Sequence, residues 1–113
     1  MTIQPIQYNN KTFLEILSDE IILSSTQDIL DLIWQAYGYD SNIFIIYEKN
    51  ISPEFFDLKT RVAGDILQKI SNYDFQLIII GNFDKYESQN LKNFILESNK
   101  SGRVYFVDSL SQA

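Results

Sequence analysis

Three short apolar runs alternate with longer segments of helical spacing, and this alternation limits what the chain can fold into. The runs are NIFIIYE at 42–48, FQLIIIG at 75–81 and RVYFVD at 103–108. Each is rich in β-branched and aromatic residues without apolar–polar alternation, which is typical of a strand covered on both faces. Strands that alternate with helices predict βαβ crossovers and a parallel sheet.

An N-terminal hairpin is predicted in front of these units. The segments IQPIQ and KTFLEIL flank YNN, which has the composition of a turn. In the second strand, Phe13, Glu15 and Leu17 would lie on one face, and Leu14 and Ile16 on the other.

Two of the predicted helices have clear end signals. Ser25 and Asp28 have the spacing of an N-terminal cap, and Gly38 would end that helix. A later helix would end at the Gly102 turn. The apolar positions at helical spacing are Ile29, Leu30, Ile33, Trp34 and Tyr37 in the first, and Leu91, Phe94, Ile95 and Ser98 in the second.

Residues 1–113 are therefore predicted to form a single α/β domain, with an N-terminal β-hairpin followed by βαβ units. We expect a mixed sheet of about five strands with roughly three to four helices, and a short helix from Ser109. A flavodoxin-like winding is the alternative. The chain has the length of one domain and contains no linker or internal repeat.

Composition excludes several function classes. The chain has no cysteine and no histidine, so thiol nucleophiles, Ser-His-Asp triads and the common zinc sites cannot be built. We expect no catalytic centre, no metal and no cofactor. A net charge of -6 disfavours nucleic acids and anionic membranes. The N-terminus has no signal-peptide pattern, and no apolar run is long enough to span a membrane, so a cytoplasmic protein is expected.

Residues 51–69, ISPEFFDLKTRVAGDILQK, raise a question because a lysine falls inside an apolar helical stripe. One interpretation of Lys59 is that its stem packs and its ammonium reaches water or a carboxylate. The other is an anion-binding or catalytic lysine in a pocket. Gly64 falls on the opposite, polar face. The stripe contains Phe55, Leu58, Val62, Ala63, Ile66 and Ile70.

The segments FFDLKTRVAGDILQKISNYDFQLIIIGNF and ESNKSGRVYFVDSL resemble the bacterial family called domain of unknown function 4180. More loosely, a strand, a helix carrying DLK and a strand ending in glycine resemble the STAS-like fold of anti-sigma-factor antagonists. The STAS-like resemblance implies a cytoplasmic regulator that binds partner proteins. Ser52 lies near the position at which some STAS-like proteins carry a phosphorylated serine, but the surrounding motif differs, so the modification is not carried over.

Polar residues are expected to gather at the carboxyl edge of the sheet, where ligands bind in open α/β folds. They can equally be ordinary caps and loop residues. The candidate ligand-binding residues there are Glu48, Ser52, Asp57, Lys59, Asn82 and Asp108.

The first functional hypothesis is a non-catalytic regulatory or protein-interaction module with an unknown protein partner, and a homodimer is one form of it. The low-relief helix face expected to form a dimer interface contains Thr60, Arg61, Gly64 and Gln68. The alternative is a protein that binds a small anionic ligand, or an unassigned enzyme, using Lys59 and nearby carboxylates.

Overall fold

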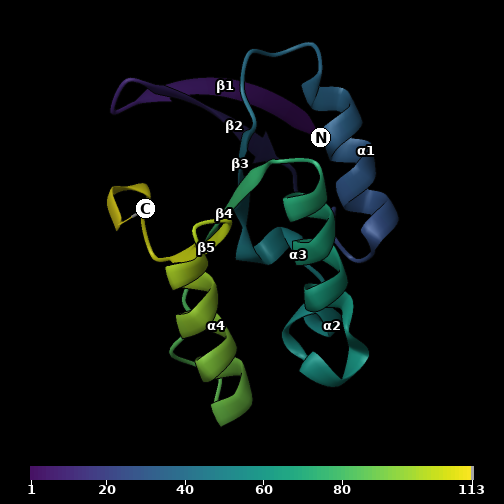
Figure 1. The fold of residues 1–113 in the computed structure, drawn as a ribbon, viewed down its shortest axis with the longest axis vertical. Coiled ribbons are helices and arrows are strands. Elements are labelled where there is room, and N and C mark those ends of the chain that lie inside the picture. The colour runs from purple at the N-terminus through teal and green to yellow at the C-terminus, as the bar shows by residue number, and fades with distance from the viewer. Residues whose placement is uncertain (113) are drawn as a thin grey trace.

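Five strands form one mixed sheet in the order β1-β2-β3-β4-β5 (Figure 1). The computed structural model describes residues 1–112. The first two strands are antiparallel, and the remaining neighbours are parallel. The predicted α/β architecture with an N-terminal hairpin is confirmed. The strands are β1 (Thr2–Tyr8), β2 (Lys11–Leu17), β3 (Ile43–Tyr47), β4 (Gln76–Ile80) and β5 (Val104–Val107).

Four α-helices accompany the sheet, and one 3-10 turn, Leu110–Gln112, ends the described chain at the position of the predicted C-terminal helix. Three of the helices connect successive parallel strands. The fourth is a single short turn that precedes the second crossover helix. They are α1 (Thr26–Ala36), α2 (Pro53–Phe56), α3 (Val62–Asn72) and α4 (Gln89–Ser101).

The sequential strand order determines where the helices lie. Every parallel crossover moves one strand further in the same direction, and right-handed crossovers of this kind place all their helices on one face of a sheet. Figure 1 shows α1 and α3 together on one side, while the hairpin tip and the C-terminal segment extend towards the other. A flavodoxin-like winding, which reverses direction within the sheet, is excluded. The central strands β3 and β4 are buried on both faces, as predicted, although the α-helices of residues 1–112 pack against one face only.

The main core fills the layer between the sheet and the helices. Phe44 of β3 and Phe75 stack with their ring centroids 5.2 Å apart. Ile66 and Ile70 of α3 are fully buried against this layer. Burial of these apolar side chains is the main source of stability. The inward strand positions are Leu14, Ile16, Phe44, Ile46, Leu77, Ile79, Val104 and Phe106.

Local sequence explains the hairpin and the start of α1. Asn9 and Asn10 both have positive φ, 49° and 65°, as a two-residue turn of the hairpin type requires, and asparagine tolerates this conformation. Ser25 Oγ accepts the backbone N–H of Asp28 at 3.3 Å, which confirms the predicted cap. However, α1 ends at Ala36, before Gly38, and Trp34 is 74% exposed rather than part of the core.

The helix predicted across 51–69 is broken into three pieces. The Asp57 side chain caps the 3-10 turn Leu58–Thr60 through the Lys59 N–H at 3.2 Å. The Thr60 hydroxyl donates to the Glu54 and Asp57 carbonyls at 2.6 and 2.8 Å. Arg61 then adopts a left-handed conformation with φ of 66°. The prediction of one continuous stripe was wrong because these side chains satisfy the backbone locally and rotate α3 relative to α2.

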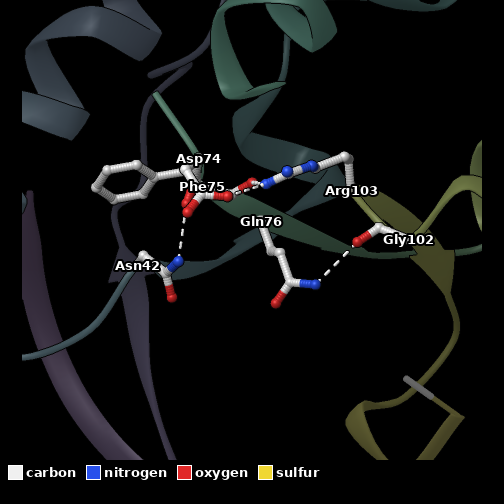
Figure 2. A network of polar contacts seen from close by, with 6 residues as sticks. All are labelled: Asn42, Asp74, Phe75, Gln76, Gly102 and Arg103. Atoms are coloured by element: carbon white, nitrogen blue, oxygen red, sulfur yellow. Dashed lines mark hydrogen bonds and ion pairs between the residues drawn. The ribbon is translucent and has the colours of Figure 1, made fainter. Parts of the chain in front are cut away.

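Polar side chains tie the amino ends of β3, β4 and β5 together (Figure 2). Arg103 Nη1 lies 2.7 Å from Asp74 Oδ1, and Asn42 Nδ2 donates to the Asp74 carbonyl at 2.8 Å. Gln76 Nε2 donates to the Gly102 carbonyl at 2.8 Å. The ion pair is largely exposed, so we expect it to contribute at most about 1 kcal/mol. This edge therefore has a structural role.

Candidate functional site

Glu48 is the centre of the polar contacts at the carboxyl edge. It follows β3, and its side chain is only 13% exposed. Glu48 Oε2 accepts the Tyr86 hydroxyl at 2.6 Å and lies 2.8 Å from Lys85 Nζ, while Oε1 accepts the Asn82 N–H at 3.1 Å. One carboxylate thus holds the loop that follows β4.

The protonation of this cluster is fixed by its contacts. Burial alone would raise the pKa of Glu48, but hydrogen bonds from Lys85, Tyr86 and the Asn82 N–H, together with the Lys85 charge, lower it below its ordinary value. Burial and the adjacent carboxylate raise the pKa of Tyr86. At neutral pH the pair is therefore a charged acceptor and a neutral donor, which is a stable structural contact.

Gly81 is required by the position of Glu48. A Cβ atom at Gly81 would lie 2.5 Å from both Glu48 Cβ and Oε1. The Gly81 N–H also donates to the Val107 carbonyl at 3.0 Å, which holds its backbone against β5. The glycine that ends the second apolar run therefore allows β3 and β4 to bring their following loops into contact.

Replacing Glu48 with glutamine is expected to lower the free energy of unfolding by about 1–3 kcal/mol at pH 7, because hydrogen bonds to a charged acceptor are lost. The folded-state pKa of Glu48 lies below its ordinary value of 4.5, so its stabilising contribution is present above pH 4.5 and lost as pH falls through the folded pKa. Urea unfolding at several pH values measures this. The difference between wild type and Glu48→Gln should shrink in acid, and a difference that does not depend on pH would contradict it.

A hollow lies beyond Gly81, between the loops after β4 and β5. Its lining includes Asn82, Asp84 and Asp108, but neither Lys59 nor any other lysine or arginine of residues 1–112. Two carboxylates without a cation do not favour an anionic ligand. Within the same residues, no group of three or more acidic side chains is placed to hold a metal ion.

Lys59 lies away from this edge hollow. Its side chain is exposed and does not line the hollow. Its place in the apolar stripe was an artefact of treating a broken segment as one helix. Asp57 is exposed as well and serves as the cap of the same turn.

The six predicted ligand-binding residues do not form one site. Glu48 and Asn82 are joined by a hydrogen bond, and Asn82 and Asp108 share the edge hollow. Ser52 is 5% exposed, and its Oγ has no hydrogen-bond partner among the described residues. The structure adds Lys85 and Tyr86, which sequence reasoning missed because their contact with Glu48 spans a loop without a recognisable pattern.

The residues predicted to form a dimer interface lie on an exposed part of the helical layer. Thr60, Arg61, Gly64 and Gln68 are all exposed, and a Cβ at Gly64 would meet no atom within 4 Å. Gln68 Nε2 donates to Asn72 Oδ1 at 2.9 Å within α3. This face is open but polar.

Among residues 1–112, no α-helix covers the other face of the sheet, which has an apolar cluster of its own. Phe13, Ile43, Ile45, Ile78 and Val107 are buried there. Half-buried apolar side chains surround this cluster: Ile6, Tyr8, Tyr47, Ile80, Tyr105 and Leu110. We call this surface the open sheet face.

The open sheet face is hollowed between the hairpin tip and the C-terminal segment. A hollow of about 130 Å³ is lined by Tyr8 and Lys11 from the hairpin, Ile78 and Tyr105 from the sheet, and Leu110. Figure 1 shows the hairpin tip and the C-terminal turn on the same side of the sheet, opposite α1 and α3. Its lining is mainly apolar and aromatic, as in protein-binding surfaces.

Charges are rare on the open sheet face. Among the strand positions that the pairing register assigns to this face, the only charged residues are Lys11 and Glu15. Glu15 accepts a hydrogen bond from the Tyr47 hydroxyl. This bond, with burial and the Glu15 charge, raises the pKa of Tyr47 to about 12. At neutral pH the hydroxyl therefore stays protonated and covers the one carboxylate of the face.

These features define a class of protein: a small α/β domain with helices on one side of a mixed sheet and an apolar face on the other. The family model described as Domain of unknown function (DUF4180) matches residues 8–113, so the chain belongs to this family. The family resemblance is thereby confirmed, whereas the STAS-like resemblance stays a prediction. Comparison with the curated proteins and with the solved structures finds no match. Among residues 1–112, no helix has the length and apolar character to cross a membrane.

Proposed function

We propose that the protein is a non-catalytic interaction module that pairs with a second copy of itself through the open sheet face. The observation that supports this proposal is the apolar cluster on the side of the sheet that carries no helix. Apolar and aromatic side chains with few charges are typical of the buried centre of protein interfaces. The expected regulatory role would then depend on this contact.

Charge favours a second copy as the occupant. The chain has a net charge of -6, so most approaches between two copies are repulsive. The strand positions of the open sheet face carry one lysine and one glutamate, which cancel. In a two-fold interface each residue is used twice, so Lys11 of one copy can face the acidic position of the other. The exposed helix face around Gly64 offers no comparable apolar area.

Substituting Tyr105 with lysine is expected to weaken the dimer at least about tenfold, because two desolvated charges enter each two-fold interface. Sedimentation velocity over a concentration series measures the dissociation constant. Gly64→Arg is the matched control, since it adds a positive charge to the polar helix face where a side chain meets open space. It should leave the constant unchanged.

Tyr8→Lys provides a second test on the same face if Tyr105→Lys fails to fold, as judged by circular dichroism. A wild type that stays monomeric at millimolar concentration would reject the proposal. Weakening by Gly64→Arg alone would move the interface to the helix face that was predicted from sequence.

A further inference from the structure

An aromatic corner lies on the helical side of the molecule, away from the open sheet face. Trp34 of α1 and Tyr37 just beyond its end lie with ring centroids 5.3 Å apart and planes at 68°. Tyr73, which ends α3, lines the same hollow of about 340 Å³. The three side chains are 74%, 62% and 47% exposed. Their rings do not pack into the core, although the sequence predicted Trp34 and Tyr37 among the apolar positions of the helix.

The corner also contains a carboxylate. Asp31 lies one helical turn before Trp34 and lines the hollow, and its Oδ1 accepts Gln27 Nε2 at 2.9 Å. Among residues 1–112, no lysine or arginine lines the hollow. Three aromatic rings and a carboxylate, two kinds of group that attract cations, therefore line the same space.

We propose that this corner binds the alkylated ammonium group of a small organic cation. Aromatic rings set at an angle attract a cation through their faces, and quaternary ammonium groups are the ligands that such rings recognise. A primary ammonium is more strongly hydrated than a quaternary one, so it loses more hydration free energy on entering an apolar hollow. Asp31 adds attraction at the rim, and the chain's net charge of -6 adds a longer-range contribution.

The charges around the hollow also limit the class of ligand that it can bind. A phosphocholine headgroup carries a phosphate close to its trimethylammonium group, and the hollow supplies no cation to pair with that phosphate. Asp31 would repel it. The ligand is therefore a free cation without a neighbouring anionic group, for which choline is a suitable probe.

Trp34 is the single tryptophan of the chain, so its fluorescence reports on this corner. Choline titrated into the full chain is expected to change that fluorescence saturably. The neutral isostere 3,3-dimethylbutan-1-ol has the same shape without the charge and should bind at least about tenfold more weakly. Phosphocholine should also bind more weakly than choline.

Two variants test the residues. Asp31→Asn and Tyr73→Leu are each expected to weaken choline binding at least about threefold. The first removes the carboxylate charge, and the second removes an aromatic ring. Tyr39→Leu is the matched control, because Tyr39 is an exposed tyrosine that does not line the hollow. All three sites are on the surface, and an unchanged melting temperature would confirm that the variants fold. No saturable change with choline, equal binding of the neutral isostere or of phosphocholine, or wild-type affinity in both Asp31→Asn and Tyr73→Leu would overturn the proposal.

Discussion

Replacing Phe55 with alanine is expected to lower the free energy of unfolding by about 3–5 kcal/mol. Phe55 belongs to α2, a single helical turn that has little stability of its own, yet its side chain is completely buried. Its ring centroid lies 5.1 Å from that of Phe56 and 6.2 Å from that of Phe106 on β5. The substitution would leave a cavity between α2 and the sheet.

Guanidinium unfolding of the two proteins measures this loss. Native domains are stable by about 5–15 kcal/mol, so the variant could lose a large part of its stability. Leu96→Ala is a suitable control because Leu96 of α4 is 58% exposed, and its change should stay within about 0.5 kcal/mol. A loss below about 1 kcal/mol for Phe55→Ala would mean that α2 is not packed into the core.

Alanine at Gly81 and alanine at Gly64 are expected to change stability in opposite directions. At Gly81 the new Cβ would lie 2.5 Å from Glu48, and the backbone is held to β5, so we expect a loss of about 1–3 kcal/mol. At Gly64, inside α3, the Cβ meets no atom within 4 Å, and the better helix propensity of alanine should add up to about 1 kcal/mol.

Thermal and urea unfolding of the two glycine variants measure whether each substitution raises or lowers the free energy of unfolding. Because both substitutions are Gly→Ala, the change in the unfolded chain largely cancels in the comparison. Equal effects at the two positions would contradict the close approach between Gly81 and Glu48. A tolerated Gly81→Ala would show that the loop after β4 can move away from β3.

The strands and their caps could be predicted from sequence because the signals are local. The three apolar runs became β3, β4 and β5 within one residue at each end. The Asn9-Asn10 turn and the Ser25 cap depend on side chains next to the backbone they satisfy. Such features require no knowledge of distant residues.

The break between α2 and α3 had a signal that a periodicity argument overlooked. Asp57 and Thr60 belong to the residue types that bond to nearby backbone groups and so favour caps over helix interiors. Giving these two residues more weight than the apolar spacing would have removed Lys59 from the buried stripe. The candidate pocket around Lys59 followed from that one error.

Strand order and long-range contacts could not be predicted. Apolar residues on both faces of β3 and β4 are equally consistent with helices on one side or on both, because an apolar face without an α-helix looks the same in sequence. Tyr86 and Glu48 are 38 residues apart, and nothing local links them. The open sheet face therefore emerged only from the structure.

Isoleucine methyl groups provide the most direct test of the proposed self-association. Isoleucines lie on both sides of the sheet, with Ile78 and Ile80 on the open sheet face and Ile66 and Ile79 in the helical core. Methyl NMR spectra recorded over a dilution series should show concentration-dependent shifts for Ile78 and Ile80, while Ile66 and Ile79 stay unchanged. Shifts confined to residues of the helical layer, or no shifts up to millimolar concentration, would contradict a dimer formed through the open sheet face.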